Sequence, residues 1–441
     1  MLDETSIARE SAWRFALRAL AHRNYRLFFS GQSVSLIGTW MTRIATSWLV
    51  YRLTGSAWLL GLVGFAGQIP VFVLAPFAGV WIDRWDRHRT LVVTQVLAML
   101  QSFALAALTL ARIITIPEIF WLSMAQGFIN AFDMPARQAF VVEMIGRRED
   151  LSSAIALNSS MVNAARLLGP SIAGIVIAAV GEGYCFLVDG FSYIAVIVSL
   201  LLMVLTLADK PRRPRAVLEE LREGWNYVGS FPPVRSVLLL LVVASLMGMP
   251  FTVLMPIFAG NVLHGGPHTL GFLMGSVGVG ALLSAAYLAA RRTVVGLGRV
   301  VAISAALFGI GLIAFAFSRF LWLSMLLLLV AGAGMMQQMA GSNTILQTIV
   351  DDDKRGRVMS FYSMAITGMI PFGSLLAGLL ASRISAPGAV MVGGSCCLLG
   401  AAWFARQLPS LRVMVRPIYI RLGILPEIAT GIQQASVVQE E

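Results

Sequence analysis

Long apolar segments recur along the whole sequence, and they restrict its fold more than any other feature. A helix needs about 20 mainly apolar residues to cross the ~30 Å hydrocarbon core of a bilayer. Of the 441 residues, 58% are hydrophobic and only 12% are charged, whereas an ordinary soluble domain is about 45–50% apolar and about 25% charged. The sequence therefore predicts an all-α membrane protein with twelve transmembrane helices. The expected spans are 27–52, 56–80, 90–112, 118–144, 153–180, 184–208, 236–262, 268–290, 298–318, 320–348, 358–382 and 386–408.

Lys and Arg residues are distributed unevenly between the two sides of these spans. If the N-terminus is placed inside, 26 of the 33 basic residues fall in inside segments, 4 in outside loops and 3 within spans. The positive-inside rule then predicts that both termini are cytoplasmic. The net charge of +11 needs no nucleic-acid partner, because no basic stripe is interleaved with aromatic residues.

The chain divides into two halves of six spans each. Two similar pentapeptides, Phe120–Met124 and Leu321–Met325, open the fourth and tenth spans, which is typical of the repeats in secondary transporters. We expect two pseudo-symmetric six-helix bundles joined by a charged cytoplasmic segment. The expected division is 1–26 cytoplasmic amphipathic N-terminus, 27–208 first bundle, 209–235 linker with an amphipathic helix, 236–408 second bundle and 409–441 cytoplasmic tail.

The loop after the second span combines a glycine, acids and arginines. It resembles the signature G-x-L-a-D-r-x-G-r-k of the major facilitator superfamily, with Asp86 in place of the second glycine. At a cytoplasmic gate, such charges can pair in one state and separate in another; a positive-inside cluster without a gating role is the alternative. The candidate gating residues are Gly79, Asp83, Arg84, Asp86, Arg87 and Arg89.

The fifth span resembles the antiporter motif of the same superfamily, g-x-x-x-G-P-x-x-G-G. Small residues allow close helix contact and Gly-Pro loosens backbone hydrogen bonding, although a plain packing seam remains possible. The motif favours export. Its candidate residues are Arg166, Gly169, Pro170 and Gly174.

Further segments, among them Leu53–Ser56, Phe132–Phe140 and Arg357–Ser360, look like the enterobactin-exporter branch of the superfamily, also called the transmembrane secretion effector group. The resemblance implies the major facilitator fold, a bacterial inner membrane, and export of an amphipathic molecule such as a siderophore or drug by alternating access and proton antiport. Transport of lysophospholipids is the alternative. One departure is that Ser123 stands where the proton-linked motif of helix four has an arginine.

Other classes of function find little support. The sequence has no nucleotide-binding loop, no catalytic constellation and no metal-ligand spacing. We therefore expect a monomeric transporter that is not an enzyme and needs no cofactor, with a small amphipathic substrate, protons and the lipid bilayer as its partners.

Polar residues inside spans are the candidates for coupling and substrate contact, because a charge at the bilayer centre costs at least about 2.5–3.5 kcal/mol. Asp133 is the deepest acid on the inner side of its span and can pair with Arg137 one turn away. Three arginines against two embedded acids predict an anionic or zwitterionic substrate. Asp189, about 9 Å from the outer end of its span, is expected at the rim. The candidates are Asp133, Arg137, Arg43, Asp189, Gln338, Asn343 and Gln347.

Overall fold

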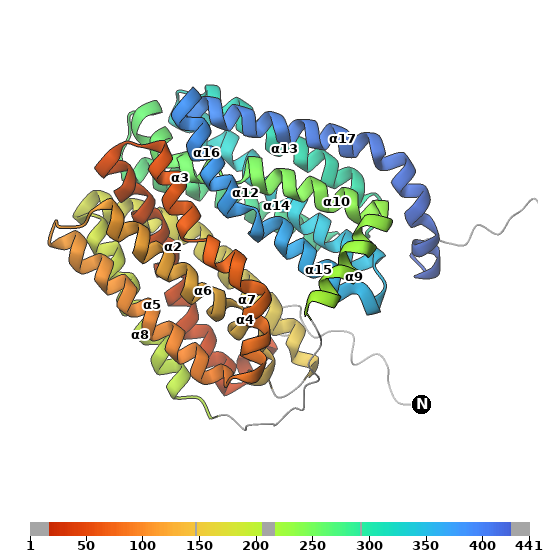
Figure 1. Ribbon diagram of the computed structural model, residues 1–441, viewed down its shortest axis with the longest axis horizontal. Helices are drawn as coiled ribbons and strands as arrows, with labels where there is room; N and C mark the ends of the chain where they lie inside the picture. Colours follow the sequence, from red (N-terminus) through yellow and green to blue (C-terminus); the bar gives the residue numbers. More distant parts are fainter. Residues whose placement is uncertain (1–16, 146–147, 205–216, 292, 425–441) are drawn as a thin grey trace, which may run out of the picture.

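The computed structural model describes residues 17–145, 148–204, 217–291 and 293–424, and these residues form helices without strands. Figure 1 shows two helical bundles that lie against each other, one formed by the red to yellow part of the chain and the other by the green to blue part. The first contains α2 (Arg23–Thr54), α3 (Ala57–Ala66), α4 (Ile69–Arg84), α5 (Arg87–Leu110), α6 (Ile116–Met144), α7 (Leu151–Val180) and α8 (Glu182–Leu201). The second contains α9 (Val217–Ser230), α10 (Pro232–Val243), α11 (Phe251–Ile257), α12 (Pro267–Ala290), α13 (Leu297–Phe317), α14 (Leu321–Ile349), α15 (Asp352–Ser363), α16 (Ile370–Ile384) and α17 (Ala386–Arg421).

These helices account for the predicted spans. Ten segments in the described residues are long and apolar enough to cross a membrane. The other two long helices, α2 and α6, have 32 and 29 residues, which is also long enough to cross a bilayer, and they complete six spans in each half. The last helix runs to Arg421, well beyond the predicted end at 408. The expected N-terminal amphipathic segment lies mainly outside the described residues.

Local turn chemistry explains where several spans begin and end. Gly55 ends α2 in a left-handed conformation at φ 62°, which glycine adopts without strain. Ser56 then caps α3 by accepting a hydrogen bond from the Leu59 amide at 3.3 Å. Thr115 and Glu118 form a capping box at the start of α6.

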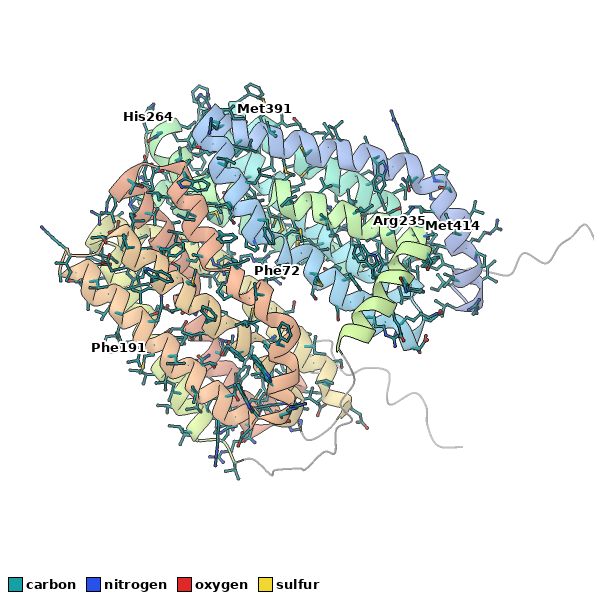
Figure 2. All side chains as sticks on the ribbon, viewed as in Figure 1. Phe72, Phe191, Arg235, His264, Met391 and Met414 are labelled. Atoms are coloured by element: carbon teal, nitrogen blue, oxygen red, sulfur yellow. The ribbon has the colours of Figure 1, made fainter. Side chains whose placement is uncertain are left out.

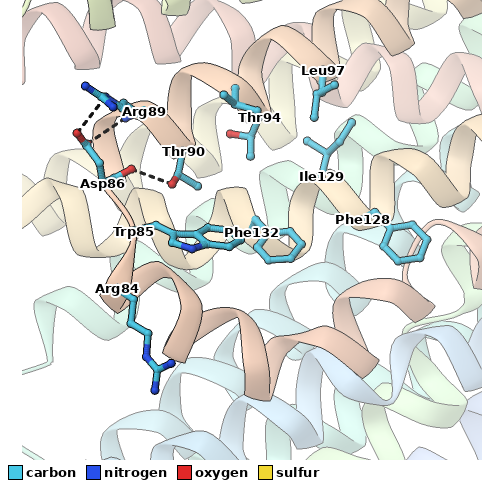
Figure 3. A pocket seen from close by; sticks show the side chains of 11 residues that line it. Arg84, Trp85, Asp86, Arg89, Thr90, Thr94, Leu97, Phe128, Ile129 and Phe132 are labelled. Carbon is cyan, nitrogen blue, oxygen red and sulfur yellow. Dashed lines mark hydrogen bonds and ion pairs between the residues drawn. The ribbon is translucent and has the colours of Figure 1, made fainter. Parts of the chain in front are cut away.

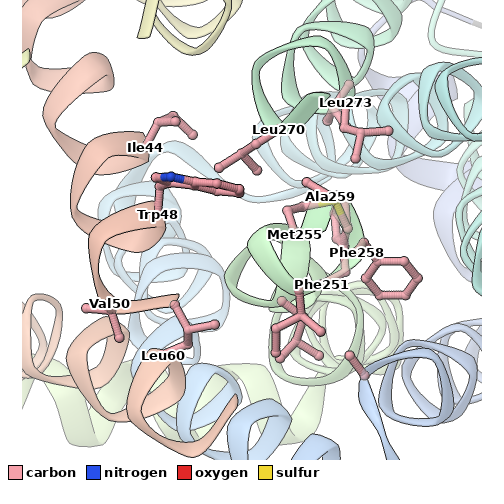
Figure 4. Packing of buried hydrophobic residues seen from close by; sticks show 14 of the residues in the cluster. Ile44, Trp48, Val50, Leu60, Phe251, Met255, Phe258, Ala259, Leu270 and Leu273 are labelled. Atoms are coloured by element: carbon pink, nitrogen blue, oxygen red, sulfur yellow. The ribbon is translucent and has the colours of Figure 1, made fainter. Parts of the chain in front are cut away.

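Three hydrophobic clusters show how the halves meet. The largest one draws residues from both halves, including Trp48 and Leu60 from the first and Phe258 and Leu270 from the second. Figure 4 shows Trp48 and Leu270 pointing toward each other. The other two clusters each belong to one half and lie toward the opposite end of the helices. The halves are therefore packed together at the end that the charge distribution assigns to the outside, which makes this an inward-facing form under the predicted orientation.

Two glycine crossings bring the halves together at this end. Gly61 of α3 meets Gly378 of α16, and Gly174 of α7 meets Gly271 of α12, each so closely that a Cβ on any of the four would lie within 3.1 Å of backbone atoms across the interface. Gly in these places lets the backbones touch directly. A hydrogen bond that the Tyr51 hydroxyl donates to Asn261 Oδ1 at 2.5 Å adds a polar link.

An aromatic contact marks the inner limit of this closure. Phe72 of α4, labelled between the bundles in Figure 2, packs edge-on against Phe372 of α16 with ring centroids 5.2 Å apart. Beyond this pair, α4 and α15 diverge toward the predicted cytoplasmic side (Figure 1).

Candidate functional site

A cavity of about 360 Å³ lies between the two halves. Its polar groups come mainly from the first half and include all the charged residues among the described lining residues. The second half contributes a largely apolar wall. The polar residues of the first half are Thr39, Thr42, Arg43, Thr46, Ser47, Gln68, Gln101, Ser123, Gln126, Asn130, Arg166, Asp189 and Tyr193, whereas the wall from the second half includes Met249, Pro250, Val253, Met274, Val277, Met335 and Ile370.

Two predicted arginines meet in this cavity at one aromatic ring. The guanidinium carbon of Arg43 lies 4.7 Å, and that of Arg166 5.5 Å, from the ring centroid of Trp40. Neither guanidinium forms an ion pair with an acid in the described part of the chain, and Nε of Arg166 is buried without a hydrogen-bond partner. Two such cations attract an acidic ligand, because a desolvated guanidinium binds carboxylate or phosphate oxygens strongly.

Asp189 lies in the same cavity and not at the rim, so its predicted position was wrong. The residue is 1% exposed, and Oδ2 accepts hydrogen bonds from Thr42 at 2.8 Å and Ser102 at 2.9 Å. Its depth along α8 could be predicted from the sequence but its direction could not, and the side chain turns inward between α2 and α5. It is the acid among the described residues that line the cavity.

Asp133 and Arg137 form the expected ion pair, but the structure places them inside the first bundle and outside the cavity lining. Asp133 is 2% exposed, and its Oδ1 accepts hydrogen bonds from Thr94 at 3.0 Å and Gln95 at 2.7 Å. Both carboxylate oxygens are thus occupied by partners from α5 and α6, which is the arrangement of a structural buried ion pair.

The polar residues of α14 also lie away from the cavity. Gln338 is buried and donates to the Leu240 carbonyl oxygen at 3.4 Å, whereas Asn343 and Gln347 bond to each other at 2.8 Å. Met335 is the residue from α14 that lines the cavity in the described part of the chain. The alternative of an interhelical polar contact therefore fits Gln338 better than a cavity wall.

The glycines of the predicted antiporter motif have different roles on two faces of α7. Gly169 lies against the Cβ of Trp40, so it lets α7 approach α2 where Trp40 contacts both arginines. Gly174 faces Gly271 of the other half, and the Pro170 carbonyl oxygen also lies against Gly271. One short motif thus supports both the cationic wall and the outer closure.

The predicted gating loop connects α4 to α5 at the other end of the bundle. Asp86 caps α5 by accepting a hydrogen bond from the Arg89 amide at 3.1 Å, which explains an acid where the superfamily signature has glycine. Arg87 is 8% exposed and pairs with Glu143 of α6, in its own half. Arg84 is exposed. The side chain of Asp83, like the surroundings of Gly79, lies outside the described part.

An open groove of about 670 Å³ adjoins this loop. Figure 3 shows Arg84, Trp85 and Arg89 at one end of the set of lining residues, with Phe132 and then Phe128 farther along. Trp85 and Phe132 are stacked at 5.9 Å. The groove is separate from the central cavity because the two share no lining residue.

Several cavity residues were not predicted from the sequence. Gln126 and Asn130 are hydrogen-bonded at 3.1 Å on α6, and Gln101 of α5 donates to the Leu122 carbonyl oxygen at 3.2 Å. Gln126 and Asn130 are four residues apart on one helix, and this spacing could have indicated a shared polar face. Gln101 and the methionine wall had no such signal, because isolated polar and Met residues are common throughout the spans.

Comparison with known proteins gives concordant results. The family described as transmembrane secretion effector matches residues 15–416. The chain is 26% identical to the staphyloferrin A transporter of Staphylococcus aureus over 81% of this chain and 89% of that protein. It is 26% identical to the multidrug efflux pump Tap of Mycolicibacterium fortuitum over 87% and 92%. A bacterial homologue of the iron transporter ferroportin, solved in an inward-facing state, superposes with a TM-score of 0.68 at 16% identity, over 87% of this chain and 98% of that one.

Proposed function

Because the chain belongs to the transmembrane secretion effector family of the major facilitator superfamily, we propose that it exports a small amphipathic organic molecule, siderophore-like or drug-like, in exchange for protons. It is a membrane transporter of an efflux family and not an enzyme. The substrate class and the proton exchange are the proposal.

The two-sided chemistry of the central cavity is the observation that carries this proposal. One wall presents Arg43 and Arg166, and the facing wall presents Met249, Met274 and Met335. Methionine side chains are flexible and polarisable, so they adapt to apolar groups of different shape. A molecule with an acidic group at one end and an apolar body matches both walls. The relatives support this class, since one is named for transport of staphyloferrin A and another for multidrug efflux.

The way in which the halves are joined supports alternating access. In the inward-facing form, the outer end is closed by glycine crossings and a shared apolar cluster, whereas the inner clusters belong to separate halves. Rocking of one half against the other around the cavity would open the outer end. Substrate would then bind from the cytoplasmic side and leave on the outside.

The test uses efflux of an amphipath with an acidic group, Nε-dansyl-lysine, from cells that lack their own efflux pumps. Expression of the chain should accelerate efflux, and a protonophore should abolish the effect. Arg166→Gln should raise the half-saturating concentration about tenfold or more, because a hydrogen bond to a charged group contributes about 1.5–3 kcal/mol. Arg383→Gln removes the same charge from an exposed position at the end of α16 and should change little.

Two results would count against the proposal. Absence of chain-dependent efflux would contradict export of acidic amphipaths, and efflux that persists with the protonophore would contradict proton exchange. An equal effect of the Arg166 and Arg383 variants would show that the cavity does not bind the acidic group.

The groove beside α5 favours a second candidate function, transport of a lysophospholipid. Arg84 and Arg89 line this groove together with the apolar residues Val93, Leu97 and Phe128, so a phosphate and a single acyl chain would find complementary surfaces. A fluorescent lysophospholipid added to inverted vesicles separates the two functions. Its movement between leaflets, without efflux of Nε-dansyl-lysine, would favour the lipid function.

A further inference from the structure

We propose that the central cavity selects zwitterionic amphipaths, with the acidic group at Arg43 and Arg166 and the ammonium group facing Asp189, from which it displaces the transported proton. The inference rests on the proposed function, since it names the substrate class and the coupling residue of the same cavity.

The first observation is that opposite charges line one cavity without neutralising each other. Neither Arg43 nor Arg166 forms an ion pair in the described residues, and Asp189 has no cationic partner there. Unpaired charges inside a membrane protein are expensive and mark substrate or ion pathways. A ligand that brings both an anion and a cation can satisfy the two sites together.

The second observation concerns the surroundings of the Asp189 carboxyl group. Oδ2 accepts hydrogen bonds from Thr42 and Ser102, whereas Oδ1 is buried without a hydrogen-bond partner and so close to Gly38 that a Cβ there would lie 2.7 Å from it. An ionised carboxylate in such a place is strongly disfavoured unless a cation accompanies it. As long as no cation is bound beside it, this environment therefore suits a protonated Asp189.

The groups around Asp189 come from each neighbouring helix. From α2, Thr42 contacts it and Arg43 lines the same cavity, as does Arg166 from α7. The contacts from α5 are made by Ser102, which does not titrate. On α8 itself, the titratable neighbours are Glu182, Cys185 and Tyr193; Glu182 is already paired with Arg52. The arginines are thus the charged neighbours of Asp189 whose charge a bound ligand can compensate.

The sign of the coupling selects the zwitterion over a simple anion. Exchange requires substrate binding to expel the proton. An anion bound at the arginines would favour a protonated Asp189, so anion and proton would bind together and be carried in the same direction. An ammonium group within a few ångströms favours the ionised carboxylate: the O–H bond of Asp189 breaks, its proton passes to cytoplasmic water, and the carboxylate pairs with the ammonium group. Only a substrate that carries a cation therefore gives antiport at this site.

Asp133 fits this role less well. Both of its oxygens have partners within the first bundle, and Arg137 already supplies the compensating charge. A substrate in the cavity does not reach it, because neither residue lines the cavity.

Three fluorescent probes with one skeleton test the inference. Nε-dansyl-lysine carries both charges, the dansyl derivative of aminohexanoate lacks the ammonium group, and dansylcadaverine lacks the carboxylate. Binding to purified full-length protein in nanodiscs is followed by dansyl fluorescence, and proton release by a pH indicator in weak buffer. The zwitterion should bind about tenfold or more tightly than either probe with one charge, and it should release protons.

Variants of the cavity show which residue binds each charged group of the ligand. Asp189→Asn should bind the aminohexanoate derivative as the unmodified protein does, which also shows that it is folded, but it should lose the preference for the zwitterion and the proton release. Arg166→Gln should weaken the zwitterion and the anion about tenfold and leave dansylcadaverine unchanged. Ser102→Ala, which keeps the carboxyl group, should retain proton release.

The outcomes separate this inference from the proposed function. Equal binding of the anion and the zwitterion, with no proton release and no effect of Asp189→Asn, would overturn the inference and leave export of acidic amphipaths standing. If the unmodified protein bound none of the three probes, the proposed function would fail as well.

Discussion

Replacement of Gly61 by alanine should shift the transporter toward its outward-facing form. A Cβ at Gly61 would lie 2.6 Å from the Ser374 carbonyl oxygen and 2.9 Å from Gly378 Cα, and ordinary contact begins at 3.4 Å. Both obstacles are backbone atoms of α16, so no side chain can rotate away. The helices α3 and α16 must separate by about 0.8 Å, and overpacking of this kind costs about 1–3 kcal/mol.

The penalty falls on one conformation only. The α3–α16 crossing belongs to the outer closure, so its separation in the outward-facing form removes the clash. Since about 1.4 kcal/mol corresponds to a factor of ten, Gly61→Ala should raise the ratio of outward- to inward-facing molecules about 5- to 150-fold. That range is large enough to measure if the inward-facing form predominates in the unmodified protein.

Labelling of a cavity cysteine from outside measures this ratio. Ser47 lines the cavity on α2, toward the predicted outer end, and Ser47→Cys can be labelled with a membrane-impermeant maleimide added to intact cells. Cys396, the half-buried native cysteine, is replaced by alanine, while Cys185 and Cys397 are buried. The labelling rate should rise with the outward-facing population.

The control is Gly356→Ala, because no atom lies within 4 Å of a Cβ at this position on α15. It should leave the labelling rate unchanged. If Gly61→Ala also leaves it unchanged, in protein that is inserted at the normal level, the α3–α16 crossing does not hold the outer end closed and the reasoning is wrong.

Three further predictions follow from the contacts of the first bundle and α14. Asp133→Asn should lower the thermal midpoint, because removal of one partner from a buried ion pair costs about 3–5 kcal/mol; loss of pH-gradient drive without loss of stability would instead make Asp133 the coupling residue. Asp86→Ala should destabilise the start of α5 by about 0.5–2 kcal/mol, whereas Asp86→Asn should keep most of the stability that the cap contributes. Equal thermal midpoints for the two variants would contradict the capping role. Asn343→Ala should leave the order of the dansyl probes by efflux rate unchanged. An altered order would show that the polar residues of α14 contact the substrate.

The positions of the spans could be predicted from the sequence because they depend on properties that are local along the chain. Apolar length and the side preference of arginine act within each segment, and turn residues such as Gly55 and Ser56 act within two or three positions. The helix α17 continues to Arg421, beyond the predicted end of the span at 408, because a helix can extend past the apolar segment that crosses the bilayer.

The direction of each polar side chain could not be predicted in the same way. Asp133 and Asp189 look alike in sequence, as single acids in apolar runs, yet one is enclosed within a bundle and the other lines the cavity. What separates them is the rotation of each helix about its axis, which depends on packing against helices distant in the sequence. Gly38, which lies against Asp189, has no distinctive sequence context, and the motif that contains Gly169 does not indicate that this residue packs against Trp40.

The two halves share a fold but contribute different chemical groups to the cavity. Their closure is symmetric, because α3 meets α16 and α7 meets α12 through the same kind of glycine crossing. The chemistry of the cavity is asymmetric, because its charges belong to the first half and its methionines to the second. A substrate held by its charges to the first half and by its apolar body to the second is contacted by both as they rock. Loss of the charged contact would leave a molecule bound only by adaptable apolar side chains. Variants of Arg166 should therefore export a wider range of uncharged compounds, whereas their export of acidic compounds should be weaker.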